Sequence, residues 1–268
     1  MIRAAVLGSP IAHSLSPLLH NTAYEFLELP AEYSAVEVAS GQLAQFIAAR
    51  DDTWTGFSLT MPLKEEILEV ADAVDAVALQ IQSANTLVRS VAGWQALTTD
   101  VEGFHEALKF HNVENFDSVT IIGSGATARA AAYACDRSGM SMHVVHRSVH
   151  RESSMRNAAP RSEIQFHNWL SQLPKTELII NTTPASVADQ FASQMQEGVH
   201  GTYFESLYNP WPTKLSAKWG EAGGKVIDGL DLLLFQGVAQ MRIFAGCDVR
   251  SQELYPLLRR VGLASLNS

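Results

Sequence analysis

The chain of 268 residues is long enough for one large domain or two ordinary ones. Hydrophobic residues make up 47% and charged residues 18%, which excludes a largely disordered protein. The net charge of -9 argues against a nucleic-acid groove, and no apolar run approaches the length of a membrane span. Because Cys135 and Cys247 provide no disulfide framework and no signal peptide is visible, we expect a cytoplasmic protein.

The first hundred residues alternate between strand-like and helical patterns. Strand followed by helix, repeated, predicts a mostly parallel sheet with helices packed on it. We place the first domain boundary near the helix that begins at Asp100. The predicted elements are strands at 4–7, 33–38 and 55–60, helices from 16, over 42–49 and from 62, a hairpin over 84–98 and a helix over 100–108.

The second half has a tighter pattern, which predicts a doubly wound sheet. A strand, a glycine turn, a helix and a second strand form a βαβ unit over 119–145, and the polar segment 148–162 is expected on the surface. The periodicity does not assign the last two helices to either domain. The other predicted elements are strands at 164–166, 178–181, 203–207 and 225–227 and helices over 232–244 and 252–261.

The turn that follows the strand at 119–122 has the pattern of a dinucleotide-binding loop. Gly123 and Gly125 allow the backbone to approach a pyrophosphate, which then lies on free N–H groups at the start of the helix. Ala128 occupies the third position of the pattern and is small enough to keep the helix against the strand. A methyltransferase with a similar glycine turn is the main alternative.

The end of the next strand indicates which dinucleotide is bound. NAD sites place an acidic residue there for the ribose hydroxyls, whereas this chain has His146, Arg147 and Ser148, with Arg151 close behind. A guanidinium matches the oxygens of a 2′-phosphate, so the sequence favours NADP over NAD. A solvated basic surface is the ordinary alternative.

Several polar residues in the first half lie where strands meet loops. Each has an ordinary explanation when it is taken alone: Ser16 and Asp100 as helix N-caps, Lys64 as a solvated lysine. The residues of this group are Ser14, Ser16, Thr60, Lys64, Asn85 and Asp100.

Together with their flanking residues, these positions resemble a known family along nearly the whole chain. The segment 8–21 (GSPIAHSLSPLLHN) resembles the N-terminal signature of the shikimate dehydrogenase family, and 56–64 (GFSLTMPLK) resembles its catalytic-lysine motif. Further blocks follow in family order at 83–86, 99–103, 123–130, 181–184, 208–213 and 229–237.

The resemblance implies a two-domain α/β protein that reduces 3-dehydroshikimate reversibly to shikimate with NADPH, on the pathway to chorismate and aromatic amino acids. It implies a substrate domain over 1–100, completed by 235–268, and a Rossmann-like NADP domain over 101–234. Lys64 and Asp100 are the implied catalytic residues.

The resemblance also implies a set of binding residues. Ser14, Ser16 and Tyr208 would hold the substrate carboxylate, and the ring hydroxyls would meet Thr60, Asn85 and Gln236. The implied cofactor-binding residues are Gly123, Ser124, Gly125, Ala126, Thr127, His146, Arg147, Ser148, Arg151, Asn181, Thr182, Thr183 and Gly229.

The chain departs from the family pattern at four positions, none of which is an implied catalytic residue. The departures are Ser58 and His146, where Asn is frequent, Ala126, where Gly is common, and Glu205, where Asp is common.

Two alternatives stay open: a quinate/shikimate dehydrogenase that uses NAD, and a non-catalytic dinucleotide-sensing homologue. The histidines show no metal-ligand spacing, so no metal is expected. The expected state is a monomer or a homodimer.

Overall fold

The computed structural model describes residues 1–169, 172–195, 198–199 and 201–267, and the chain divides into two compact units. Unit 1 comprises Met1–Gly103 and Leu234–Ser268, and unit 2 comprises Phe104–Leu233. The chain passes between the units twice, each time within a helix: α5 (Asp100–Phe110) and α10 (Gly229–Ala245).

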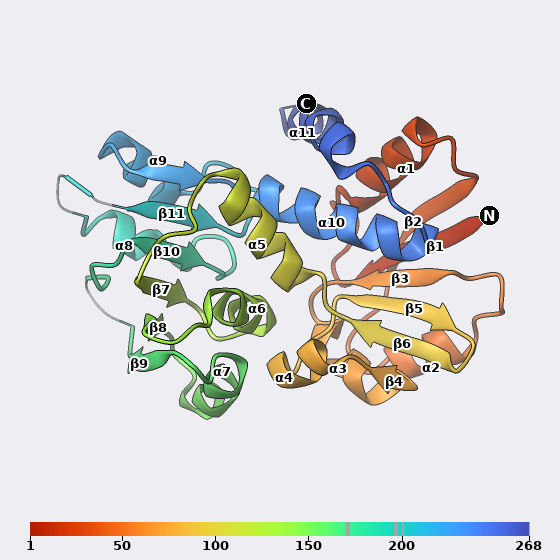
Figure 1. The fold of residues 1–268 in the computed structure, drawn as a ribbon, viewed down its shortest axis with the longest axis horizontal. Helices are drawn as coiled ribbons and strands as arrows, with labels where there is room; N and C mark the ends of the chain where they lie inside the picture. Colours follow the sequence, from red (N-terminus) through yellow and green to blue (C-terminus); the bar gives the residue numbers. More distant parts are fainter. Residues whose placement is uncertain (170–171, 196–197, 200, 268) are drawn as a thin grey trace. The chain divides into compact units, whose positions relative to one another are not determined.

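Unit 1 is built on a six-stranded mixed sheet in the order β2-β1-β3-β5-β6-β4 (Figure 1). Strands β1, β2 and β3 are parallel, and β5 and β6 form the antiparallel hairpin that the sequence predicts. Its elements besides α5 and α10 are β1 (Ile2–Gly8), α1 (Ser16–Phe26), β2 (Ala31–Glu37), α2 (Leu43–Ala48), β3 (Gly56–Leu59), α3 (Leu63–Val70), β4 (Ala73–Val74), α4 (Ala76–Ile81), β5 (Thr86–Ser90), β6 (Gly93–Leu97) and α11 (Ser251–Leu266).

Strand β3 shows how the sequence assigns side chains to the two faces of this sheet. Phe57 and Leu59 join the core cluster that includes residues of α2 and α3, and the Phe57 ring stacks on Trp54 at 4.9 Å. Because side chains alternate along a strand, Ser58 points to the opposite face. There it meets Gln240 of α10, so a polar residue on a buried strand is matched by a polar residue on the covering helix.

Unit 2 is built on a six-stranded parallel sheet in the order β12-β11-β10-β7-β8-β9 (Figure 1). This is the doubly wound order of a Rossmann-like fold, as expected from the sequence. Its elements besides α5 and α10 are β7 (Ser118–Ile122), α6 (Ala126–Cys135), β8 (Ser141–Val145), η1 (Val149–Arg151), α7 (Glu152–Ala158), β9 (Glu163–His167), β10 (Leu178–Asn181), α8 (Asp189–Ala192), β11 (Thr202–Glu205), α9 (Lys214–Glu221) and β12 (Lys225–Ile227).

The central strands of this sheet are covered on both faces. Every residue of β10 and of β11 is buried, as expected of a parallel sheet between two helical layers. One layer contains α8 and α9, where Phe191 and Trp219 pack against Ile179 of β10. The continuous apolar runs that predicted these strands therefore reflect burial on both sides.

The structure differs from the sequence prediction mainly in short elements. The segment 148–162 is not simply a surface segment, because it forms η1 and α7, and Met155 and Ala158 are buried. Only these two positions of α7 face the core, so the polar composition concealed the helix. The elements β4, α4, α8 and α9 were not predicted, and α10 begins at Gly229 instead of 232.

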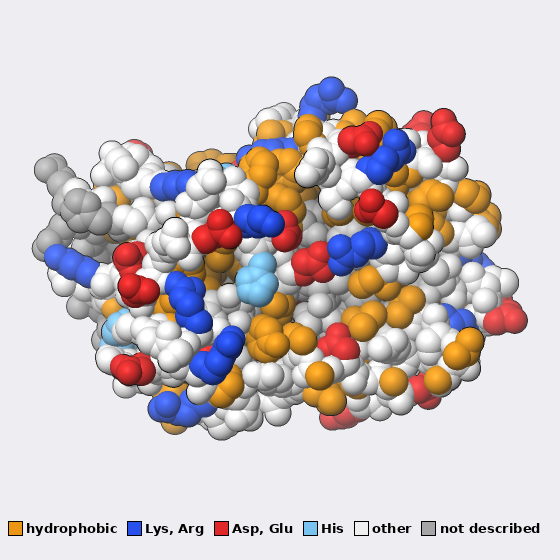
Figure 2. All heavy atoms as spheres, in the orientation of Figure 1, with side chains coloured by type: hydrophobic (Ala, Val, Ile, Leu, Met, Phe, Trp, Pro, Cys, Tyr) orange, Lys and Arg blue, Asp and Glu red, His pale blue; other side chains and the backbone are white. Residues whose placement is uncertain are grey.

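The surface carries charges of both signs. Figure 2 shows acidic and basic side chains interspersed over the face in view. Among the helices of the described ranges, none is long and apolar enough to cross a membrane.

Candidate active site

The topology of unit 1 brings the polar residues of the first half to one edge of its sheet. Strands β1 and β3 are parallel and both end at this edge, so the loops after them lie there. Strand β5 is antiparallel to β3 and begins at the same edge, directly after Asn85. Strand β6 is antiparallel to β5 and ends there, shortly before Asp100. Residues far apart in the sequence therefore meet at this edge.

Lys64 and Asp100 form a close pair at this edge. Lys64 lies in the first turn of α3 and Asp100 is the first residue of α5. The Lys64 ammonium donates to Asp100 Oδ2 at 2.6 Å, and the two side chains are 16% and 6% exposed. A lysine and a carboxylate of such low exposure can act chemically as a proton-transfer group and an acceptor that orients it.

Asn85 connects this pair to α10. Its side-chain amide nitrogen donates to Asp100 Oδ1 at 2.9 Å and to Gln236 Oε1 at 3.0 Å. Asn85 is buried, and its side-chain oxygen accepts the backbone N–H of Thr99 at 2.8 Å. The structure thus brings together four predicted site residues, Lys64, Asp100, Asn85 and Gln236.

The predicted carboxylate-binding serines lie after β1. The expectation that Ser16 caps α1 is wrong: Leu15 is the N-cap, Ser16 is the first helical residue, and no side chain caps the helix from that position. Instead Ser14 Oγ accepts the backbone N–H of Ser16 at 3.3 Å. Thr60 follows β3, and its backbone N–H donates to Leu7 O at 2.9 Å, which holds the two strand ends together.

In unit 2, the glycine loop has the shape that a pyrophosphate needs. Gly123 has φ +117, and a Cβ there would lie 2.4 Å from Thr182 Oγ1, so no side chain fits. Gly125 is the N-cap of α6 without a capping side chain. A Cβ on Gly125 would meet, among the described atoms, only Arg151 Nη1, at 3.8 Å. A half-buried glycine at a helix start that has no capping side chain and lies beside a guanidinium fits a phosphate group.

The loop after β8 carries the residues that were expected to read the adenosine end. Arg147 is exposed, and its guanidinium lies over the Trp169 ring at 5.1 Å. His146 is buried, its Nδ1 accepts the backbone N–H of Ser148 at 3.2 Å, and its Nε2 lies 3.4 Å from Glu152. The His146 ring therefore shapes the loop from inside, whereas Arg147 is open to a ligand.

The ends of β10 and β11 are tied together by a buried carboxylate. Glu205 accepts hydrogen bonds from Asn181 Nδ2, from the Tyr203 hydroxyl at 2.8 Å and from Thr213 Oγ1 at 3.0 Å. Asn181 Oδ1 in turn accepts the Thr183 hydroxyl at 2.8 Å. Burial raises the pKa of the Glu205 carboxyl above its usual value, against the effect of these donors.

Asn181 and Thr183 thus use their side chains inside unit 2, whereas Thr182 packs under the glycine loop. The Thr182 hydroxyl donates to Ile122 O at 2.9 Å, which holds it below Gly123.

Gly229 of unit 2 packs against the loop that carries Tyr208. Tyr208 is half-buried on the loop after β11. A Cβ on Gly229 would lie 2.3 Å from the backbone carbon of Leu207, so the start of α10 packs directly on the loop that carries Tyr208. Gly229 is therefore required for close backbone packing.

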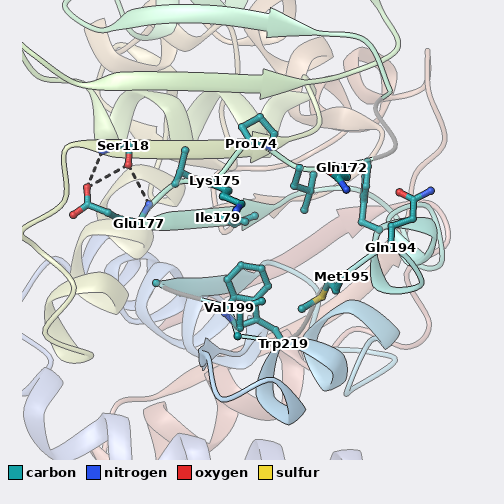
Figure 3. A pocket seen from close by; sticks show the side chains of 15 residues that line it. Ser118, Gln172, Pro174, Lys175, Glu177, Ile179, Gln194, Met195, Val199 and Trp219 are labelled. Atoms are coloured by element: carbon teal, nitrogen blue, oxygen red, sulfur yellow. Dashed lines mark hydrogen bonds between the residues drawn. The ribbon is translucent and has the colours of Figure 1, made fainter.

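A cavity of about 360 Å³ lies elsewhere in unit 2 (Figure 3). It is lined by Ser118, Ile179 and Gly201, which stand at or near the amino ends of β7, β10 and β11, and by apolar side chains such as Met195 and Trp219. The glycine loop stands at the carboxyl ends of these parallel strands, where doubly wound sheets bind their ligands. The cavity is thus at the opposite edge from the cofactor-binding loops.

Several buried polar residues next to the site were not predicted. Thr86, Thr99 and Gln240 all bond to Asn85 or to its neighbours. Gln240 had a usable signal, because it follows Gln236 by one helical turn within an otherwise apolar stretch.

Comparisons with known proteins agree with this arrangement. Residues 6–87 match the family described as the shikimate dehydrogenase substrate binding domain. The chain is 34% identical over 257 residues to shikimate dehydrogenase (NADP(+)) of Nostoc sp., covering 89% of each protein. Among solved structures, shikimate dehydrogenase of Mycobacterium tuberculosis is 33% identical with a TM-score of 0.85, covering 97% of this chain and 100% of that one.

A further solved structure is shikimate 5-dehydrogenase of Thermus thermophilus in complex with NADP(H) and shikimate. It is 28% identical with a TM-score of 0.82, covering 97% of this chain and 100% of that one. The doubly wound unit and the lysine–aspartate pair on a second α/β unit define a two-domain oxidoreductase that uses a dinucleotide. The chain belongs to the shikimate dehydrogenase family.

Proposed function

We infer that this protein is an NADP-dependent shikimate dehydrogenase, which reduces 3-dehydroshikimate reversibly to shikimate. The observation that carries this inference is the pair of Lys64 and Asp100, 2.6 Å apart, bonded through Asn85 to Gln236 at the sheet edge of unit 1. The three relatives named above are called shikimate dehydrogenases, and each of them covers about nine-tenths or more of the chain.

Lys64 is the proton donor for reduction and the proton acceptor for oxidation at the substrate oxygen. Its ammonium has three donors, and Asp100 accepts one of them, which leaves the others to meet the substrate oxygen. When bound, NADPH supplies the hydride that reduces the carbon, and NADP accepts it in the reverse direction. Asp100 orients the ammonium, and its second oxygen is held by Asn85.

The rest of the proposed substrate site follows the roles that the family resemblance implies, with which the hydrogen-bonding chemistry of these residues agrees. Ser14 and Ser16 hold the substrate carboxylate beside the start of α1, where hydroxyls and the helix terminus favour a negative charge. Thr60, Asn85 and Gln236 bind ring hydroxyls. Tyr208 as a further ligand of the carboxylate stays a prediction.

The cofactor site follows from the loops at the carboxyl edge of the unit 2 sheet. The backbone around Gly123 and Gly125 receives the pyrophosphate, with Arg151 beside it. Arg147 binds the 2′-phosphate, since its guanidinium is exposed and carried over the Trp169 ring. Two expected contacts, those of His146 and Asn181, would have to use the backbone, because both side chains bond within unit 2.

The test is a rate assay of the purified protein that follows the absorbance of the reduced nicotinamide. Shikimate and quinate are each offered with NADP and with NAD. We expect the highest kcat/KM for shikimate with NADP. A preference for quinate with NAD would favour the quinate/shikimate alternative, and dinucleotide binding without turnover of any pair would favour a sensing homologue.

We further propose that the active form is a monomer or a homodimer and that it works in the cytoplasm. The mixed charges on the surface suit either state (Figure 2). Light scattering at several protein concentrations tests the first point, and a larger assembly would contradict it.

A further inference from the structure

A chain of buried hydrogen bonds runs through unit 1 from β2 to the proposed substrate site. The Tyr33 hydroxyl donates to Ser58 Oγ at 2.6 Å, and Ser58 Oγ donates to Gln240 Oε1 at 2.8 Å. These bonds join two strands of the sheet to the helix that covers it, because Tyr33 belongs to β2, Ser58 to β3 and Gln240 to α10. All three side chains are buried.

The series of hydrogen bonds continues from Gln240 to Asn85 along two routes. Gln240 Nε2 donates to the backbone carbonyl of Asn85 at 2.9 Å and to Thr86 Oγ1 at 3.0 Å. Thr86 Oγ1 then donates to Asn85 Oδ1 at 3.0 Å. Gln240 thus contacts the main chain of Asn85 directly and its side chain through one hydroxyl.

Only one assignment of donors and acceptors is consistent with all of these hydrogen bonds. The carbonyl oxygen of Asn85 can only accept, so the nitrogen of the Gln240 amide must face it and the amide oxygen must face Ser58. Ser58 therefore donates to Gln240 and accepts from Tyr33. On the other side, the Thr86 hydroxyl accepts from Gln240 and keeps its hydrogen for Asn85 Oδ1.

The orientation of the Asn85 amide agrees with this direction. Its oxygen receives Thr86 and the Thr99 backbone N–H, so its nitrogen faces Asp100 and Gln236. In a buried site, an amide turned the wrong way would place its nitrogen against donors and leave polar groups without partners, which costs more than the loss of one bond in water.

We propose that Gln240 is a positioning residue for the substrate site, acting through Asn85. The proposal rests on the proposed function, in which Asn85 and Gln236 bind ring hydroxyls. Gln240 contacts neither Lys64 nor Asp100 in the hydrogen bonds of the described residues, so its effect on the substrate passes through Asn85, to which it bonds directly and through Thr86.

The first test replaces single links with side chains of similar shape. Gln240→Met removes both amide atoms, and Thr86→Val replaces the hydroxyl with a methyl group. We expect Gln240→Met to raise KM for shikimate by roughly tenfold and Thr86→Val by roughly threefold to tenfold, with KM for NADP changed less than twofold. Thr55→Val is the matched control, because Thr55 Oγ1 bonds the Arg3 backbone N–H at the far end of the same sheet.

A purely structural role predicts a different result. The melting temperature would fall, and KM for shikimate and KM for NADP would stay near their normal values in the folded fraction. That outcome would overturn the proposal. If Gln240→Met does not fold, Thr86→Val decides alone, because it keeps the volume of the core.

The second test is a double-mutant cycle with Asn85→Ala. If Gln240 acts through Asn85, adding Gln240→Met to Asn85→Ala leaves KM for shikimate within about twofold of the single Asn85→Ala variant. Independent, multiplying effects would overturn the proposal. Failure of the proposed function is recognised separately, because the unaltered protein would then not turn over shikimate with either cofactor.

Discussion

Lys64 is the residue on which the proposed chemistry depends most. We expect Lys64→Ala to lower kcat by about 10²–10⁴-fold, because the variant has no group to exchange a proton with the substrate oxygen. Folding and NADP binding should persist, since the lysine is only partly buried at the edge of unit 1. Steady-state kinetics measures kcat, and a titration with NADP measures cofactor binding by the folded variant. Lys109→Ala, on the exposed last turn of α5, is the control. Near-normal turnover would exclude Lys64 as the proton donor.

Arg147 is the residue that should distinguish the two dinucleotides. Arg147→Ala removes the guanidinium proposed to bind the 2′-phosphate, so KM for NADP should rise about tenfold or more while KM for NAD changes little. Arg156→Ala is a matched control, because Arg156 is also exposed and lies over an aromatic ring, that of Phe166, at 4.7 Å. An equal rise for both cofactors would show that Arg147 does not read the phosphate.

At the residue scale, the sequence predicted which side chains gather at the edge of unit 1 but not how they are held. Lys64 and Asp100 could be found because their motifs are specific. Thr86 could not, because a buried polar residue is recognised only when its partners are known, and the one signal for Gln240 was its spacing of one helical turn from Gln236. The expectation that Ser16 caps α1 is wrong because a serine before a proline is typical of a helix N-cap, whereas here the helix includes Ser16 and its N-cap is Leu15.

At the scale of elements, the packing of α10 on the unit 1 sheet leaves no space at Gly56. A Cβ there would lie 2.4 Å from Phe244 Cε1 and 2.6 Å from Leu87 O. We expect Gly56→Ala to lower the free energy of unfolding by about 1–3 kcal/mol, as overpacking of a core does. Urea unfolding measures the change.

Gly237→Ala in α10 is the control, because it should change the free energy of unfolding in the opposite direction. A Cβ there meets no described atom within 4 Å, and alanine is the better helix former. Gly237→Ala should therefore raise the free energy of unfolding by up to about 1 kcal/mol. Equal losses from the two variants would show that contact with Phe244 is not the cause.

The sequence predicted the longer elements well, because a buried strand or an amphipathic helix repeats its pattern over several residues. The all-parallel sheet of unit 2 followed from such runs, and its topology was confirmed. Short elements such as α8 (four residues) and β4 (two residues) are too brief for any periodicity to be recognised. Tertiary packing forms them, and α7 was missed because it buries so few of its positions.

At the scale of the whole molecule, His20 makes stability depend on pH. Burial lowers the pKa of His20 to about 3, and the unfolded chain titrates near 6.5. Between these values the unfolded state binds a proton that the folded state does not, so stability falls as pH falls below about 6.5. The expected loss is roughly 1.4 kcal/mol per pH unit from this one group.

His20→Phe tests this prediction, because phenylalanine keeps a ring against Tyr33, on which the His20 ring stacks at 3.9 Å. Urea unfolding at pH 7.5 and at pH 5 gives the free energy of unfolding at each pH. The difference between the two values should be smaller for the variant than for the unaltered protein. The buried Glu205, whose raised pKa acts in the opposite direction, is present in both and cancels in the comparison. Equal differences would show that His20 is not the source.

The sequence pattern alone could not assign the last two helices to a domain, since an apolar face indicates burial without identifying the partner. The resemblance to a family implied that these helices belong to the substrate domain. In the structure, Gln236 of α10 bonds to Asn85 of that domain. The family itself could be identified from the order of its motifs along the chain, which no periodicity provides.

The discontinuity of unit 1 has a consequence for how the protein is made. A ribosome releases residues 1–103 first, yet α10 and α11 emerge only after all of residues 104–233. At roughly 5–20 residues per second, that interval is on the order of ten seconds. During it, Ser58 and the backbone of Asn85 lack the Gln240 that satisfies them in the finished fold. We therefore expect the nascent N-terminal segment to need a chaperone more than the dinucleotide-binding unit, whose sheet is continuous in the chain.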